Sequence, residues 1–484
     1  MKKTFIFGFI LCSFIALWAN DISAQEYKYD LNKYYTPDIV RNSLDLNFNS
    51  GGSLDRSARK SLDSQIVGDT IIYSNLSGEL HAQFSSYIST RKSESLLQLN
   101  LDLSGSLRKS DFPTIYNASY PDTFSSSSSE GIHIDYGKKM YGANKKFFSF
   151  GLSSTLNPST NYLKETITSS TTEKTTNYFR TDITPFIGIG IGRIESVKDA
   201  RQAIYILEDL SKRGVLTRHL SDDEIFKFSQ IISQVKNKRF LDSRLHKIDE
   251  ISTVDSFLVK NNLLTKSDAR YFTTLYDNWE NSANFERTSG QSFEVRLSPD
   301  VNWNNQKSES KISNPSSDTW NKQNDKNYGA SLAFNYNYAK QINLNWEKTA
   351  NVSLSGSTTR EQQRLSYETS SQEFLYERNV RNITLNGNYR IGYYPSTRTN
   401  LSASISQSFY KNFYDEVTST GWKNSFNSLT TLGFSAVYYV SPQLSLSGNT
   451  SIYNNYSNYR SSSFKANQNQ LSAGFSVALK YSFF

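Results

Sequence analysis

Charged side chains recur at alternate positions within otherwise small and polar segments of this 484-residue sequence. Alternate positions on a β-strand face the same side of a sheet, so these charges would share one face with Ser, Asn, Thr and Gly. Such a face leaves room for water, and fixed charges of both signs can set which solutes pass through a pore. We therefore expect eight residues to line a water-filled lumen: Asp102, Arg180, Asp182, Glu294, Arg296, Asp300, Arg390 and Lys480.

Enzymatic chemistry has little support in the sequence. His133 and Asp135 would share one face of a strand, as an acid–base pair could, but no nucleophile is marked beside them. No His, Asp or Glu cluster has the spacing of metal ligands. The alternating glycines of 188–192 lie at a strand end before Arg193, which favours close packing over phosphate binding. We predict no catalytic residue, no metal and no cofactor; an enzyme is only the second alternative.

The C-terminal segment 471–484 indicates the kind of sheet. Small and polar residues alternate there with an apolar row made of Leu471, Ala473, Phe475, Val477, Leu479, Tyr481 and Phe483. A period of two predicts a strand with one apolar and one polar face. A long strand that ends the chain on aromatic residues is typical of the closing strand of an outer-membrane barrel, where a sheet must close because lipid cannot satisfy an open edge.

The same alternation recurs upstream. We expect strands at about 41–50, 71–89, 94–108, 130–142, 146–158, 175–192, 288–304, 325–342, 348–362, 374–393, 399–413, 427–440, 442–456 and 470–484. The predicted fold class is an all-β transmembrane antiparallel up-and-down barrel of about 14 strands, with 12 or 16 as alternatives. The first strand has the weakest pattern, and tyrosines near strand ends, such as Tyr394 and Tyr439, are expected to anchor the barrel at the membrane interface.

The predicted connections have two lengths. Short ones lie at 142–145, 394–398 and 441–442, whereas long polar ones are expected at 109–130, 158–175, 304–325, 359–373, 415–428 and 457–468. Barrels of this class have short periplasmic turns and longer outer loops.

One segment, from about 194 to 281, has a helical period instead. Val197, Ala200, Ile204, Leu207 and Leu210 recur every three or four residues. Further helices are predicted to open at 221 and 267, with one near 239–260; Ser196 with Asp199 resembles a capping box, and Gly214 a C-cap. About six strands precede the segment and about eight follow it, so it should lie at the periplasmic end, where the chain enters and leaves.

The N-terminus predicts secretion. Lys2 and Lys3 precede the apolar run 5–18, and a cut after Ala24 would complete a signal peptide. The single cysteine, Cys12, lies in this leader, so the mature chain would have no thiol chemistry. The formal charge of +8 is spread along the chain, and nucleic acid is therefore not an expected partner.

The leader ending at Ile22–Gln25, the tyrosine- and asparagine-rich strands and the final Phe483–Phe484 resemble porin-like outer-membrane β-barrel proteins of Bacteroidota-type envelopes. The resemblance covers nearly everything outside the helical segment and identifies no single family. It implies the outer membrane of a Gram-negative bacterium as the location, and outer-membrane lipid and the barrel-assembly machinery as partners.

The expected organisation is a signal peptide (1–24), a periplasmic N-terminal segment (25–40), barrel strands (41–193), an α-helical periplasmic insert (194–281) and further barrel strands (282–484). The leading hypothesis is a channel for small polar solutes, with the insert as a lid or docking domain. The alternative is a non-conducting anchor or scaffold, whose insert would bind a periplasmic or outer-membrane protein.

Overall fold

The structure is a computed structural model that describes residues 29–59, 69–112, 121–167, 170–237, 247–282, 284–313, 316–368, 370–415, 422–441, 443–461 and 465–481. The predicted signal peptide, with Cys12, lies outside the described residues, as do the terminal aromatics Phe483 and Phe484.

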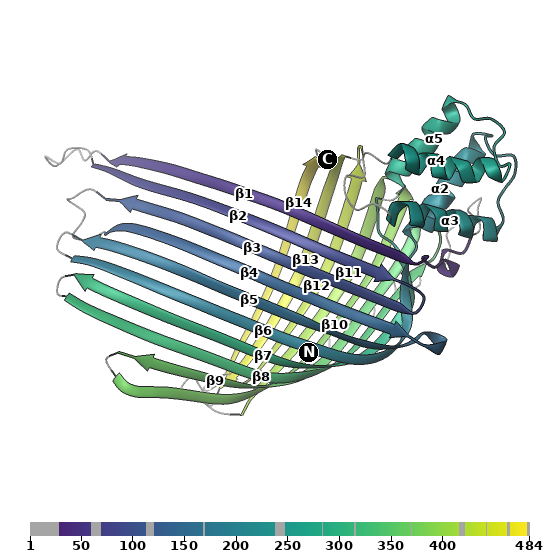
Figure 1. Ribbon diagram of the computed structural model, residues 1–484. Coiled ribbons are helices and arrows are strands. Elements are labelled where there is room, and N and C mark those ends of the chain that lie inside the picture. The colour runs from purple at the N-terminus through teal and green to yellow at the C-terminus, as the bar shows by residue number, and fades with distance from the viewer. Residues whose placement is uncertain are drawn as a thin grey trace.

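The described residues form one sheet of 14 antiparallel strands, in which each strand pairs with the next along the chain. The first six are β1 (Ile39–Arg59), β2 (Asp69–Ser89), β3 (Ser93–Asp111), β4 (Asp122–Tyr141), β5 (Lys146–Ile167) and β6 (Ser170–Ser196). After the helices come β7 (Thr288–Ser313), β8 (Ser316–Gln341), β9 (Trp346–Tyr367), β10 (Ser370–Ser396), β11 (Thr399–Tyr414), β12 (Trp422–Tyr439), β13 (Leu444–Ser461) and β14 (Lys465–Tyr481). The predicted fold class, an up-and-down barrel sheet with a helical insertion, is confirmed (Figure 1).

Most strands are longer than the alternation predicted, because the polar segments expected to be long loops continue the ladders. The segment 304–325 is the end of β7 and the start of β8, paired continuously from Asn304↔Asp325 to Ser313↔Ser316. The prediction of long loops was likewise wrong for most of 158–175 and 359–373. Cross-strand pairs of polar and opposite-charge side chains, such as Lys164–Glu173 at 2.9 Å, stabilise these extensions.

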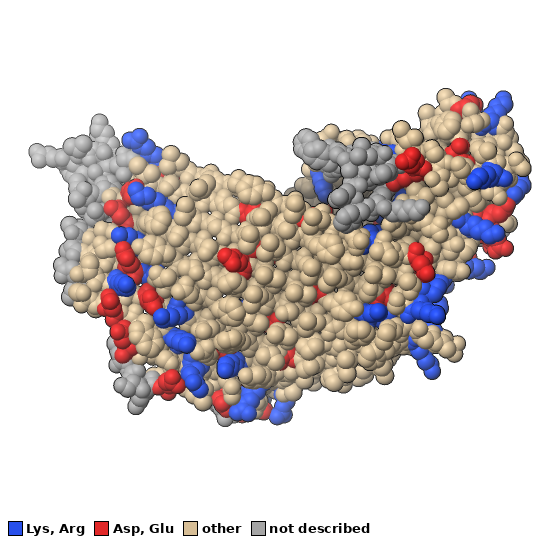
Figure 2. Space-filling view, in the orientation of Figure 1, with Lys and Arg blue, Asp and Glu red and all other residues tan. Residues whose placement is uncertain are grey.

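The sheet has two chemically different faces. Directly opposite residues of an antiparallel pair share a face, so Ile183, Val301 and their neighbours form an apolar face. Its side chains are exposed over many strands, as in Phe475 (85 % exposed), which is the pattern of a surface that contacts lipid rather than water. In Figure 2 the charged side chains gather towards the two ends of the molecule and leave the middle largely uncharged. The opposite, polar face is called the lumen face below.

The two edges of the sheet are not joined by a ladder. The sheet curls, so that β1–β9 form one wall and β10–β14 lie behind it (Figure 1). Within the described residues no strand pairing links β1 to β14, and most residues of β14 are exposed. The seam between β1 and β14 is therefore where the backbone of the sheet has unpaired groups.

Four α-helices lie between β6 and β7 in the described part of the chain: α2 (Lys198–Lys212), α3 (Asp222–Asn237), α4 (Lys247–Lys260) and α5 (Ala269–Asn281). They are called the helical unit below. None of the described helices is long and apolar enough to cross a membrane.

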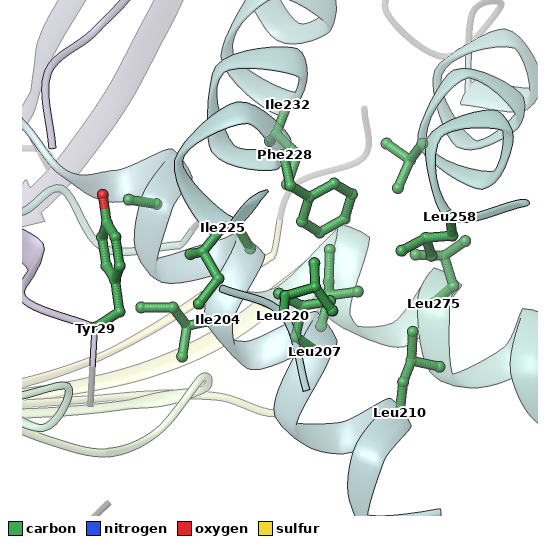
Figure 3. Packing of buried hydrophobic residues seen from close by; sticks show 14 of the residues in the cluster. Tyr29, Ile204, Leu207, Leu210, Leu220, Ile225, Phe228, Ile232, Leu258 and Leu275 are labelled. Atoms are coloured by element: carbon green, nitrogen blue, oxygen red, sulfur yellow. The ribbon is translucent and has the colours of Figure 1, made fainter. Parts of the chain in front are cut away.

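The helical unit has its own hydrophobic core. Figure 3 shows the packing of side chains from all four helices, among them Ile204, Leu207, Phe228, Leu258 and Leu275. Three residues from the segment before β1, which contains the 3₁₀ turn η1 (Leu31–Lys33), belong to the same cluster: Tyr29, Leu31 and Tyr34. The N-terminal segment is thus packed against the helices before the chain enters the sheet.

The helix ends correct some of the predictions. Ser196 does not cap α2: it is the last residue of β6, and α2 follows Val197, which makes no side-chain cap. Asp268, not Ser267, caps α5 by accepting a hydrogen bond from the Tyr271 amide. The predicted end at Gly214 is confirmed by its φ of 69°, a left-handed conformation that favours glycine.

The number of strands before and after the helical unit is even, as predicted, so the unit and the two ends of the sheet's chain lie at the same end of the strands. Six strands precede it and eight follow, so it lies at the end of the sheet where β1 begins and β14 ends. That this end is periplasmic remains a prediction.

The start of α3 generates a prediction about pH. Glu224 accepts from the Ser221 amide at 2.9 Å and from both terminal nitrogens of Arg218, and these contacts lower its pKa from 4.5 to about 2, with the Arg218 hydrogen bonds as the largest cause. Because the folded pKa lies below the unfolded one, this stabilisation is complete above about pH 4.5 and is lost as the pH falls towards about 2.

We expect the midpoint temperature of the thermal transition of the helical unit to decrease when the pH is lowered from about 6 to about 3. Circular dichroism on the full chain measures it. The Glu224→Gln variant should have a lower midpoint temperature than the unmodified protein at about pH 6, and its midpoint should decrease less between about pH 6 and about pH 3. An identical pH dependence in the two proteins would contradict the role of this carboxylate.

Candidate functional site

The register places all eight predicted lumen residues on the lumen face. Asp182 pairs with Asn302, and Asn302 with Asn327, on the face opposite Ile183 and Val301. Asp102 lies on β3, Arg180 on β6, and Glu294, Arg296 and Asp300 on β7, whereas Arg390 and Lys480 lie on the other wall, on β10 and β14. The structure therefore brings together the β6 and β7 residues, but not Arg390 or Lys480 with them.

One group of these residues forms a hydrogen-bonded ladder across strands. Arg180 Nε donates to Asp182 Oδ2 at 2.8 Å, and Asn302 Nδ2 donates to Asp182 Oδ1. Asn327 Nδ2 continues the ladder by donating to Asn302 Oδ1 at 3.2 Å. The Asp182 carboxylate is therefore held by the Asn302 amide on one oxygen and by its charged partner Arg180 on the other.

A second group, nearer the helical unit, surrounds the buried carboxylate of Glu294. Glu294 is 6 % exposed, accepts from the Ser149 hydroxyl at 2.6 Å and pairs with Arg296 at 3.1 Å. The Arg296 guanidinium lies over the Phe186 ring, 4.0 Å from its centroid. These contacts fix Arg296 against the wall.

Glycine makes this second group possible. Gly151 lies directly opposite Phe186, and a Cβ on Gly151 would collide with the Phe186 ring and with the Tyr136 carbonyl. The sequence prediction missed Phe186 and Ser149. An inward-facing aromatic at the start of an alternating glycine run was the available signal for Phe186.

The two histidines of the sheet are both bonded to aspartates. His81 Nδ1 lies 2.5 Å from Asp102 Oδ1, and His133 Nε2 lies 2.5 Å from Asp135 Oδ2. The other nitrogen of His133 is 2.8 Å from the Thr155 hydroxyl. The ladder between β4 and β5 includes His133↔Thr155, so the backbone at these two residues takes part in strand pairing. No metal-binding group of three His, Cys, Asp or Glu exists within the described residues.

A buried clamp joins the helical unit to the rim of the sheet. Arg201 of α2 donates to the carbonyls of Ser282 and Phe285, at 3.0 and 3.1 Å. Arg287, just before β7, donates to the Leu344 and Asn343 carbonyls and lies 3.8 Å from Glu347. Burial is the largest cause lowering the pKa of both arginines, to about 10 for Arg287.

Tyr394 is the centre of this clamp. Both guanidinium groups lie over its ring, Arg201 at 5.5 Å and Arg287 at 4.5 Å, and its hydroxyl donates to Glu347 at 2.9 Å. Tyr394 is fully buried. The expectation that it anchors the protein at the membrane interface was therefore wrong, because its neighbouring charges attract the ring into the rim.

Two further contacts fasten the helical unit at other points of the rim. Arg41 at the start of β1 donates to Asn237 of α3 at 3.0 Å. Arg398, in the turn between β10 and β11, pairs with Asp277 of α5 at 2.8 Å. The helical unit thus reaches from the first strand of the sheet to the opposite wall.

Between the helical unit and the rim lies a cavity of about 1110 Å³. Its lining comes from β1, β6, all four helices and the turns after β10 and β12. The lining is rich in charge of both signs, and several of these charges are paired, as in Lys247–Glu280 at 3.0 Å. Such a lining is suited to water and polar solutes.

Comparison with known proteins identifies no family. No protein-family model and no curated protein matches the chain. Among solved structures, it is similar to the toluene transporter TodX of Pseudomonas putida (8 % identity, 93 % of this chain and 95 % of that chain, TM-score 0.29). It is also similar to the ferric yersiniabactin receptor FyuA of Yersinia pestis (7 %, 92 % and 72 %, 0.33) and the transport unit of the Escherichia coli autotransporter AIDA-I (8 %, 96 % and 94 %, 0.25). These likenesses are too weak to carry an argument, and the fold assignment rests on the strand pairing above.

The clamp generates a stability prediction. Arg287→Met should leave the Glu347 carboxylate buried without its cation and lower the free energy of unfolding of the helical unit by about 3–5 kcal/mol. Arg398→Met, which breaks the more exposed pair with Asp277, should lower it by only about 0–1 kcal/mol. Hydrogen exchange of α2 and α5 in the detergent-solubilised full chain measures both; equal losses would contradict the clamp.

Proposed function

We propose that this protein is an outer-membrane β-barrel that forms a channel for small polar solutes, with the helical unit fixed over its periplasmic mouth. The observation that carries the proposal is the separation of faces: an exposed apolar face surrounds a lumen face of Ser, Asn, Gly and charged residues on all walls. In a membrane the apolar face would contact lipid, and the polar face would enclose water.

The cavity beneath the helical unit supports a path to the periplasm. It touches the start of β1 at Arg41 and the turn after β12 at Ser441, on opposite walls of the mouth. A solute that leaves the lumen at this end would pass through the cavity. The helical unit therefore acts as a fixed cover that narrows the mouth.

The proposal predicts discrete conductance of the purified, folded protein in planar bilayers. Asn284 lines the cavity, and its Nδ2 has no hydrogen-bond partner among the residues that the structure describes. Asn284→Trp should fill part of the cavity and lower the single-channel conductance by roughly half, because a narrower mouth passes fewer ions.

Ser252→Trp is the matched control, since Ser252 is exposed on α4 and does not line the cavity. Its conductance should equal that of the unmodified protein. Silent bilayers with demonstrably folded protein would refute the channel, and equal conductance in the two tryptophan variants would refute the path through the cavity.

A second candidate function is a scaffold that binds another envelope component. It is favoured by exposed apolar side chains on the outer helices, namely Ile248 (80 % exposed), Val259 and Phe272. A crosslinked partner that is lost in Phe272→Asp, with conductance unchanged, would support this function. Unchanged crosslinking in the Phe272→Asp variant would contradict the scaffold function.

A further inference from the structure

One wall of the lumen has more carboxylates than cations. On β3–β8, from the rim to the level of the Asn304–Asp325 pair, the lumen positions hold seven carboxylates and three cations. Glu94 and Lys139 lie directly opposite each other and add one charge of each sign. The other carboxylates are Asp102, Asp135, Asp182, Glu294, Asp300 and Asp325, and the other cations are Arg180 and Arg296. The shared register places all of them on one face.

The two guanidinium groups are already neutralised. Arg180 is bonded to Asp182, and Arg296 is bonded to Glu294 and packed on Phe186. Neither arginine is directed at another carboxylate of the wall by these contacts. The charges of Arg180 and Asp182 therefore cancel, and so do those of Arg296 and Glu294.

The other four carboxylates keep uncharged or histidine partners. Asp325 accepts from the Gln323 and Asn304 amides, at 2.9 and 3.2 Å. Asp300 faces Gly329, where a Cβ would lie 2.5 Å from its oxygen, so glycine leaves the carboxylate room. Asp102 and Asp135 are each bonded to a histidine, His81 and His133, at 2.5 Å.

The opposite wall does not restore the balance. At the matching depth its lumen positions are uncharged on β11, where Ser402, Ser404, Ser406 and Ser408 follow one another. Arg390, directly opposite Ser404, and Lys480, near the rim, are the cations that β10 and β14 add to this wall, so the carboxylates of the lumen still outnumber its cations. A narrow lumen with low-dielectric walls concentrates the field of such an excess and raises the local concentration of the opposite ion.

We propose that the channel selects cations over anions and that Asp102, Asp135, Asp300 and Asp325 set this selectivity. The inference rests on the proposed channel function and extends it to the charge of the solute: small cations and cationic polar molecules pass in preference to anions.

The test is the reversal potential of the full-length mature protein in a planar bilayer under a potassium chloride gradient at a fixed pH of about 8. The unmodified protein should be selective for potassium. The variant with all four aspartates changed to asparagine keeps the side-chain shapes and should lose at least about half of the potassium-to-chloride permeability ratio. Arg180→Gln should raise the ratio, because it frees the charge of Asp182.

Asp223→Asn and Asp318→Asn make the same chemical change outside the lumen and should leave the ratio unchanged. A conducting channel that is unselective or prefers chloride would overturn the inference while leaving the channel function intact. So would a fourfold variant with an unchanged ratio. Silent bilayers would overturn the channel function itself, and the inference with it.

Discussion

The structure depends on one constraint: a strand must pair its backbone on both sides while its side chains divide between two environments. Ladders that join each strand from β1 to β14 to the next meet the first requirement, and the alternation of apolar and polar residues meets the second. The two are coupled, because a slip of one residue would move Asp182 and Glu294 to the apolar face and Ile183 to the lumen. The ladders therefore also position every charge of the lumen.

Among the described residues, the constraint is unmet at the two edges of the sheet and over short interruptions, as around Pro185 and Pro299. The helical unit joins two parts of the rim. It is fastened to β1 through Arg41 and Asn237, and to the far wall through Asp277 and Arg398. An unpaired edge in lipid costs several kcal/mol per backbone group, so a device that limits the distance between the walls has a clear physical use. The N-terminal segment contributes to it, since Tyr34 is buried among the helices immediately before β1 begins.

The sequence predicts the sheet well and the clamp poorly, for the same reason. Alternation is a local property, so all the strands and the lumen positions of Asp182 or Arg296 can be inferred from a few neighbouring residues. The lengths of the loops could not be inferred in this way. The serine- and threonine-rich ends of β5 to β8 have the composition of loops, and they form strands because they pair with the neighbouring strand. The clamp joins Arg201, Arg287 and Tyr394, which are far apart in the chain, and Tyr394 alone looks like any tyrosine at a membrane interface.

The difference between buried and exposed contacts indicates how the helical unit could move. Moving α2 off the rim would draw the fully buried Arg201 away from the Tyr394 ring, whereas the exposed pair of Arg398 and Asp277 contributes about 1 kcal/mol or less. A swing of the whole unit away from the mouth would have to break the clamp and is therefore disfavoured. A small opening on the side of the β10–β11 turn would break only the exposed pair and would use the clamp as its pivot. The width of the mouth is thus set mainly by the fixed cavity and only slightly by motion.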